Sequence, residues 1–181
     1  MAVTVREARP AEYDAIGELT AAAYAIYPEA ADDPAYMAEL RDVARRAADC
    51  PIYVALDEEG RVLGGAMYVP GPDNPHAESE RDGEAGIRML AIAPWAQGRG
   101  AGTALTQALV DRARAKGRRG IALLSLPPMT TAHHMYQRLG FRRAEDRDWE
   151  PEPGLRLLGF ALDLAPEVVS PAGRRADSGG S

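Results

Sequence analysis

The sequence predicts one mixed α/β domain of the α+β kind, a central sheet of six to seven strands flanked by about four helices. Three observations predict it. The chain has 181 residues, 46% of them apolar and 27% charged, which suits one packed core. Apolar residues follow a period of two in some segments and of 3.6 in others. A strand–helix–strand run over residues 85–126 is typical of a right-handed parallel crossover.

The first half of the chain predicts a strand, two helices and a hairpin. Pro10 opens the first helix, and Asp32 or Asp33 caps the second, which starts near Pro34. A turn at residues 57–60 joins the two hairpin strands. We expect these elements at residues 3–9, 11–27, 34–47, 52–56 and 62–69.

The second half predicts the crossover, a further helix and a closing pair of antiparallel strands. Gly117 and Gly120 close the crossover helix, and Gly140 ends the next helix. We expect these elements at residues 85–93, 98–116, 121–126, 130–139, 141–144 and 155–164. The domain is then residues 1–165, and the Gly/Ser/Arg-rich tail 166–181 is predicted to be disordered because it has nothing to bury.

Composition excludes several classes of protein. Cys50 is the only cysteine, so a disulfide scaffold is excluded. No apolar run approaches the roughly 20 residues of a membrane span, and the first residues lack a signal-peptide core. The net charge of −6 argues against a nucleic-acid partner, and three histidines without ligand spacing argue against a metal site. We expect a cytoplasmic protein without membrane association.

Charge is distributed unevenly along the chain. Residues 12–42 carry eight acids and one base, whereas residues 97–119 carry six bases and one acid. Taken singly, these charges are ordinary solvated helix faces. Taken together, they fit two sites, one for a polyanionic cofactor and one for a cationic amine.

The chemistry is concentrated in residues 84–103, where a buried strand leads into a glycine-rich turn that opens a helix. Gly98, Gly100 and Gly102 alternate, which lets the backbone approach a ligand closely. The helix N-terminus adds unpaired N–H donors and the positive end of the helix dipole, and Arg99 adds a fixed charge. This pattern predicts a phosphate-binding turn.

Two common phosphate motifs do not fit. A Walker A loop needs a lysine, and Lys116 is the only lysine in the chain. The dinucleotide fingerprint needs a third glycine where this chain has Thr103 or Leu105. What remains is Gln97-x-x-Gly100-x-Gly102.

This turn resembles the acetyl-CoA signature of the GNAT N-acetyltransferase superfamily, [Gln/Arg]-x-x-Gly-x-[Gly/Ala] at a strand-to-helix junction. The strand 88–94 ends in Pro as the family's central strand does, and residues 132–141 resemble its second motif, with Tyr136 in the helix and Gly140-Phe141 after it. The resemblance covers about residues 3–164. One departure is Met129, which stands where the family often has Asn.

The resemblance implies a GNAT-like fold and acetyl-CoA as co-substrate, without a metal. The pantetheine arm would lie along the strand at Leu90, Ala91 and Ile92, with the Ile92 N–H as the oxyanion donor. The pyrophosphate would bind the backbone N–H groups of Gln97, Gly98, Arg99, Gly100, Ala101, Gly102 and Thr103.

The resemblance also suggests catalytic groups. Tyr136, which also lies beside the cofactor in the family, is our candidate acid for the leaving thiolate; the alternative is a core tyrosine. Glu84 is our candidate base, through a water, with Glu80, Asp82 and His133 as rivals. The alternative for Glu84 is a solvated acid.

The predicted activity is direct transfer of an acetyl group from acetyl-CoA to a primary amine. The first two helices and the loop at 71–83 would wall the acceptor, and their acidity favours a polyamine, an aminoglycoside-like base, or a peptide N-terminus or lysine. Alternatives are a non-catalytic acyl-CoA-binding or regulatory module, a longer acyl donor, and a hydroxyl acceptor. A homodimer is possible by resemblance alone.

Overall fold

A computed structural model describes residues 2–164, so the predicted tail and the domain boundary at 165 lie outside the described residues. Eight strands are present in this range: β1 (Thr4–Glu7), β2 (Ile52–Leu56), β3 (Val62–Val69), β4 (Glu84–Ile92), β5 (Gly120–Ser125), β6 (Arg142–Arg143), β7 (Trp149–Glu152) and β8 (Leu155–Asp163). The helices of the same range are α1 (Tyr13–Tyr24), α2 (Pro28–Ala31), α3 (Pro34–Arg41), α4 (Val43–Ala47), α5 (Ala101–Ala115) and α6 (Thr130–Arg138). Short 3₁₀ turns occupy Pro10–Glu12, Pro94–Ala96 and Glu145–Arg147.

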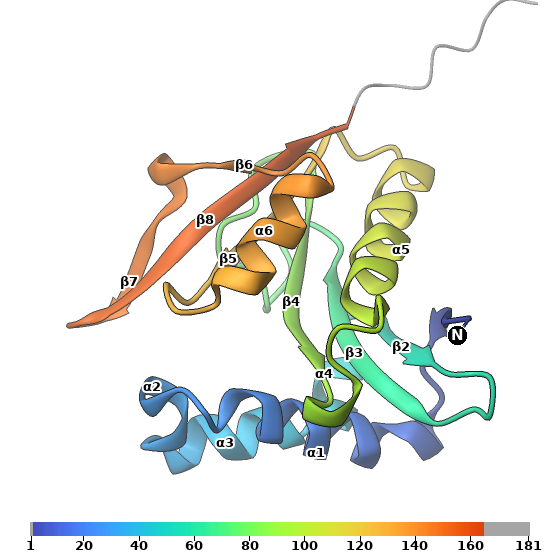
Figure 1. Cartoon of the computed structure of the whole chain (residues 1–181). Coiled ribbons are helices and arrows are strands. Elements are labelled where there is room, and N and C mark those ends of the chain that lie inside the picture. Colours follow the sequence, from blue (N-terminus) through green and yellow to red (C-terminus); the bar gives the residue numbers. More distant parts are fainter. Residues whose placement is uncertain (1, 165–181) are drawn as a thin grey trace, which may run out of the picture.

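The strands form one sheet in the order β1-β2-β3-β4-β5-β8-β6, with β7 paired to β8 (Figure 1). Only β4 and β5 are parallel among the described strands, and α5 connects them. The predicted parallel pairing of the two strands joined by a helix is therefore confirmed, and so is the predicted antiparallel closing pair. The mixed single-domain fold is also as predicted.

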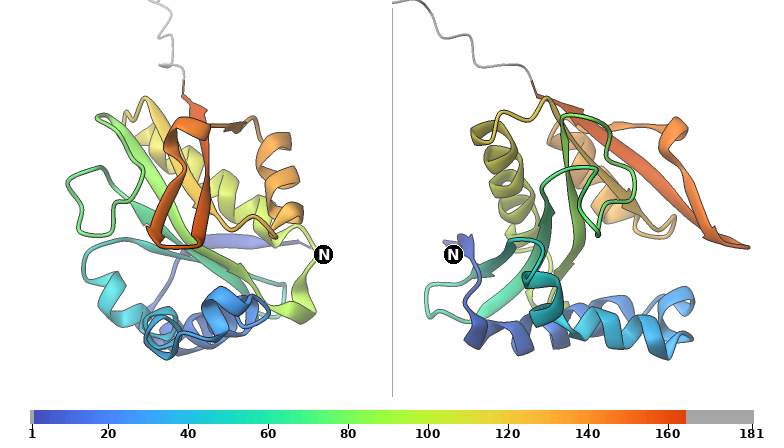
Figure 2. Two further views of the ribbon diagram at one scale, coloured as in Figure 1. Left: turned by 90° about the vertical axis from the view of Figure 1, so that its left-hand side faces the viewer. Right: turned by 180° about the vertical axis from the view of Figure 1, so that it is seen from behind.

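Helices cover both faces of the sheet (Figures 1 and 2). Alternate residues of β2 belong to different cores, because successive side chains of a strand point to opposite faces. Tyr53 and Ala55 belong to the core that includes Leu105 and Leu109 of α5. Ile52 and Val54 pack with Ile16 of α1 and Val43 of α4, among others.

The helix and strand counts exceed the prediction for local reasons. The second predicted helix is divided into α3 and α4, because Asp42 ends one helix and caps the next by accepting the Arg45 N–H. Pro28 does not end the first helix but opens α2 as its first residue. The extra strand β7 forms a hairpin with β8 that projects from the body of the molecule (Figure 1).

Candidate active site

The sheet opens between β4 and β5. Their pairing runs only from Glu84–Gly120 to Ile87–Leu123, so the second half of β4 continues without β5 beside it. The Ala93 N–H donates to the Leu63 carbonyl of the β3 strand at 2.8 Å. Because successive N–H groups of a strand point to opposite edges, the Ile92 N–H points into the opening.

A β-bulge lies at the point where the strands diverge. Met89 has a φ of +50°, the only positive value at a non-glycine residue in the described range. Its register places two residues of β4, Met89 and Leu90, against the single Ala66 of β3. A bulge bends its strand and redirects the main chain that follows. No sequence signal indicated it, because the strained backbone of Met89 depends on tertiary pairing.

The glycine turn after β4 has the conformation that the motif predicts. Gly98 has a φ of +77° and Gly100 a φ of +84°, values that suit glycine. Both residues are exposed, and a Cβ on either would meet nothing within 4 Å. α5 begins directly after Gly100, so its first N–H groups, from Ala101 onward, have no partner within the helix.

A cavity of 570 Å³ lies beside this turn, and we call it the glycine-turn cavity. Nine of the predicted cofactor residues line it: Leu90, Ala91, Ile92, Gln97, Gly98, Gly100, Ala101, Gly102 and Thr103. Residues of α6, among them Met135 and Arg138, form the opposite wall. Arg99 does not line it; its guanidinium carbon lies 5.6 Å from the Trp95 ring centroid.

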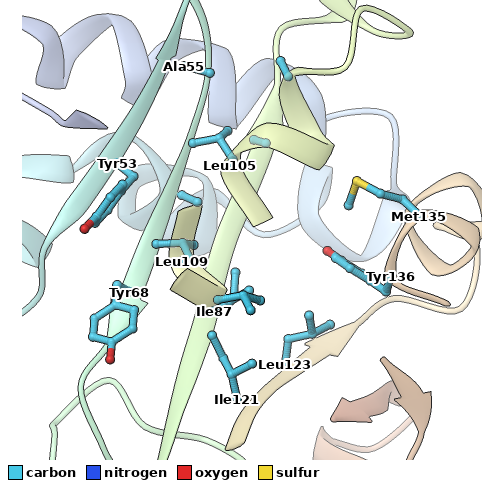
Figure 3. Close-up of a cluster of buried hydrophobic side chains, with 14 of the residues drawn as sticks. Tyr53, Ala55, Tyr68, Ile87, Leu105, Leu109, Ile121, Leu123, Met135 and Tyr136 are labelled. Carbon is cyan, nitrogen blue, oxygen red and sulfur yellow. The ribbon is translucent and has the colours of Figure 1, made fainter. Parts of the chain in front are cut away.

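Tyr136 is buried next to this cavity, not in its wall. Its ring packs against Phe141 and Phe160, with centroid separations of 5.7 and 5.8 Å. Figure 3 shows the ring extending from α6 toward β4, near Ile87 and Leu123. Burial raises the pKa of its phenol above the ordinary value of 10.0, so the hydroxyl stays protonated at neutral pH.

A second cavity, of 600 Å³, lies on the other side of the opening, and we call it the acidic cavity. Carboxylates line it from three regions of the chain: Glu29, Asp32, Asp33, Glu39, Glu78 and Glu152. Its apolar walls include Met89, Leu124 and Trp149. Arg88 is the one cationic residue in this lining, and it is ion-paired with Glu78 at 2.6 Å.

The two cavities share Tyr24 and Met129 as lining residues. Tyr24 lies at the end of α1, edge-on to the Tyr36 ring at 6.3 Å between centroids. Burial raises its pKa too, with further contributions from Tyr36 and Tyr136. Sequence reasoning missed Tyr24, because an aromatic residue at a helix end carries no motif. It noted Met129 only as a departure from the family pattern.

The structure does not bring Glu84 to either cavity. Glu84 begins β4, eight residues before Ile92, and the Arg147 guanidinium donates to both of its oxygens at 2.7 Å. Burial raises its pKa, but hydrogen bonds from Arg147 and from the Arg81 N–H outweigh this and lower the pKa. A carboxylate so engaged is a poor proton acceptor, so this geometry does not favour Glu84 as the base, and that role stays a prediction.

The rival bases lie in three different environments. Glu80 accepts the backbone N–H groups of Glu78 and Ser79, and Asp82 is exposed. Neither residue lines the glycine-turn cavity or the acidic cavity. His133 is half-buried on α6, and its Nε2 lies 3.0 Å from the Ser125 hydroxyl. Glu78, which sequence reasoning did not select, lines the acidic cavity, and burial raises its pKa.

Two further findings concern the described residues as a whole. Within residues 2–164, no three His, Cys, Asp or Glu residues lie together in a way that could hold a metal ion. Among the helices of the same range, none is long and apolar enough to cross a membrane.

Comparison with known proteins decides the family. The model of the acetyltransferase (GNAT) family matches residues 14–141. The chain belongs to the GNAT acetyltransferase family. The resemblance predicted from the sequence is therefore confirmed.

Individual relatives agree with this assignment. A mycothiol acetyltransferase of Sanguibacter keddieii is 33% identical over 147 residues, which cover 78% of this chain and 44% of the relative. The chain thus spans less than half the length of the curated relatives that it matches. A GCN5-related N-acetyltransferase from Kribbella flavida is 29% identical, with a TM-score of 0.67 over 90% of this chain and 98% of that one.

A phosphinothricin acetyltransferase of Sinorhizobium meliloti, solved in complex with acetyl-CoA, has the same fold. It is 22% identical, with a TM-score of 0.67 over 96% of this chain and 94% of that one.

Proposed function

We propose that this GNAT protein transfers the acetyl group of acetyl-CoA directly to a primary amine of a cationic acceptor. The observation that carries the proposal is the pair of cavities that meet at the opening between β4 and β5. One suits a polyanionic donor and the other a cationic acceptor. Tyr24 and Met129, which line both, mark the place where donor and acceptor would meet.

The residues of the glycine-turn cavity fit acetyl-CoA. The open left-handed turn at Gly98 and Gly100 leaves room beside the unpaired N–H groups that begin α5. Such groups stabilise phosphate oxygens. The unpaired edge of β4 at Leu90 and Ile92 can bond an extended amide-containing arm as an added strand would.

Transfer to an amine requires three functions of the protein. The acceptor must be deprotonated, because an alkylammonium with a pKa of about 10.4 is not a nucleophile. The oxygen of the thioester carbonyl gains negative charge and needs a donor, for which the Ile92 N–H is available. The leaving thiolate needs a proton, and the buried phenol of Tyr136 is protonated at neutral pH. These steps form a C–N bond and break the C–S bond without an acyl-enzyme.

The acidic cavity supports a cationic acceptor. Its only cation, Arg88, is neutralised by Glu78, which leaves carboxylates on α3, on the segment before it and on β7 to face a ligand. Tyr24, Tyr36 and Trp149 add aromatic faces, which attract cations. A polyamine, an aminoglycoside-like base or a peptide amine carries the positive charge that these carboxylates would bind.

The test is release of CoA thiol from acetyl-CoA with a panel of amines, with the product identified by mass. The panel contains diamines, polyamines, aminoglycosides, lysine peptides, peptides with free N-termini and matched alcohols. We expect turnover with amines that carry a second positive charge. Binding of acetyl-CoA without turnover of any amine would favour the non-catalytic acyl-CoA-binding module instead.

A further inference from the structure

The hydroxyl of Ser125 and the imidazole of His133 form a pair at the edge of the acidic cavity. Ser125 is the last residue of β5, two positions beyond the point at which β5 leaves β4. It is buried, and it lines the acidic cavity together with Met89 on the opposite strand. His133 Nε2 lies 3.0 Å from its Oγ.

The fold holds the His133 ring in place. The centroid of the His133 ring lies 4.9 Å from that of Phe160, a residue of β8, so the two rings pack together. A neutral imidazole has a single N–H. In the tautomer that carries it on Nδ1, Nε2 is left to accept the Ser125 hydroxyl proton, for which the Met129 Sδ, 3.6 Å from Oγ, is the other acceptor.

The surroundings of His133 keep the ring neutral. Burial has the largest effect and lowers the pKa of His133 below 6.5. The nearby charges of Arg143 and His134 lower this pKa further, whereas hydrogen bonding to the Leu126 backbone raises it. Arg143 comes from β6 and is itself ion-paired with Asp148 at 2.6 Å. His134 is the exposed neighbour on α6. A neutral imidazole at pH 7 is able to take up a proton.

We propose that Ser125 and His133 form the proton relay that deprotonates the acceptor amine. The ammonium of the acceptor gives a proton to Ser125 Oγ, while the Ser125 hydroxyl proton passes to His133 Nε2. The N–H bond of the acceptor breaks, its electron pair becomes the nucleophile, and the imidazole becomes imidazolium. Ser125 touches the acceptor, whereas His133 acts through Ser125. The relay rests on the proposed function and supplies the base that Glu84 does not.

The geometry separates this proton path from the path to the leaving group. His133 and Tyr136 lie three residues apart on α6, and both rings pack on Phe160. Residues at this spacing share a helix face. His133 would therefore take up the proton relayed from the acceptor at one turn of α6. Tyr136, one turn further on, would donate its proton to the leaving thiolate.

The test is the pH profile of kcat/KM for the amine in the whole protein. The natural protein is expected to lose activity as the pH falls below 6.5, because His133 becomes protonated. His133→Gln should lower kcat/KM on the order of 10²-fold near neutral pH and remove this acidic limb. Ser125→Ala should do the same, and the double variant should be no slower than either single variant. Calorimetric binding of acetyl-CoA should be unchanged in all three.

His134→Gln is the matched control, one residue along the same helix and exposed, and its profile should match that of the natural protein. A limb that survives in His133→Gln, or that disappears in Glu78→Gln instead, would overturn the relay while leaving the transferase function intact. Parallel loss of activity and acetyl-CoA binding in His133→Gln, with the limb kept, would show a merely structural pair. Failure of the natural protein to acetylate any amine would overturn the proposed function and the relay together.

Discussion

At the residue scale, Tyr136 owes its protonation state to its packing. Its ring packs against Phe141 and Phe160, and the residue is buried. Loss of hydration disfavours the phenolate, which raises the pKa of the phenol. The phenol is therefore protonated at neutral pH and able to supply a proton.

Tyr136→Phe keeps the aromatic packing and removes only the hydroxyl. We expect kcat to fall on the order of 10²-fold, with little change in the affinity for acetyl-CoA or in the melting temperature. Thiol release, calorimetry and thermal unfolding measure the three quantities. Full activity of the variant would assign Tyr136 to the core alone.

Glu84, in contrast, has both carboxylate oxygens hydrogen-bonded within the protein. Its side chain is 10% exposed and that of Arg147 is 4% exposed, and the two groups form a bidentate pair. The pair ties the start of β4 to the 3₁₀ turn before β7. A motif places a residue on an element, but it does not reveal a partner 63 positions away in the chain.

Glu84→Gln leaves the Arg147 charge buried without its partner. We expect the free energy of unfolding to fall by about 3–5 kcal/mol, with kcat per folded molecule unchanged. Asp146→Asn is the control, because its pair with Arg81 is exposed and should contribute less than about 1 kcal/mol. Lost turnover in a stable Glu84→Gln protein that still binds acetyl-CoA would restore Glu84 as the base.

At the scale of elements, the acidic cavity is built from segments far apart in the sequence. α3 and the segment before it, the loop before β4, and the hairpin β7–β8 each contribute carboxylates or aromatic rings. Charge that converges from several elements attracts a cation more strongly than one solvated helix face does. We therefore expect the affinity for the acceptor to depend on several of these acids together rather than on any single one.

The triple variant Glu29→Gln, Asp32→Asn, Glu39→Gln removes three of these charges. We expect KM for a dicationic amine to rise about tenfold, kcat to change little, and KM for acetyl-CoA to stay constant. The control Asp14→Asn, Glu58→Gln, Asp111→Asn changes the net charge equally at residues outside both cavities. Equal KM values for the amine in the two variants would show that these acids do not recognise the acceptor.

Local signals account for the elements that the sequence predicted. The order of strands and helices, the crossover and the glycine turn all rest on patterns within about 20 residues, such as the alternating glycines after β4. The division of α3 from α4 depends on the Asp42 cap, and the Met89 bulge depends on pairing with β3. The acidic cavity is formed by residues from distant segments, such as Tyr24, Met89 of β4 and Trp149, so one motif could not predict it.

At the scale of the whole molecule, buried and paired carboxylates couple stability to pH. Hydrogen bonds from Arg143, Arg156 and the Gly159 N–H lower the pKa of Asp148, and those from Arg147 lower that of Glu84. A carboxylate whose pKa is lowered on folding stabilises the protein above its unfolded pKa of about 4. This stability is lost as the pH falls through the folded pKa. Glu78, whose pKa is raised, acts in the opposite direction.

We therefore expect the urea midpoint of unfolding to fall steadily below about pH 4, and to fall less steeply in Asp148→Asn. Equilibrium unfolding monitored by circular dichroism from pH 7 to pH 3 measures this dependence. A midpoint in the natural protein that does not change over this range would contradict the account.

Calorimetric titration with acetyl-CoA measures whether the glycine turn binds this co-substrate, on which the proposed function depends. Gly100→Asp places a side chain and a negative charge at the N-terminus of α5, whereas Gly117→Asp does so at the other end of the same helix. Both glycines have positive φ, of +84° and +67°, and open surroundings, so the backbone strain is matched. We expect micromolar binding in the natural protein and in Gly117→Asp, and none in Gly100→Asp. Equal binding by the two variants, or none by the natural protein, would contradict it.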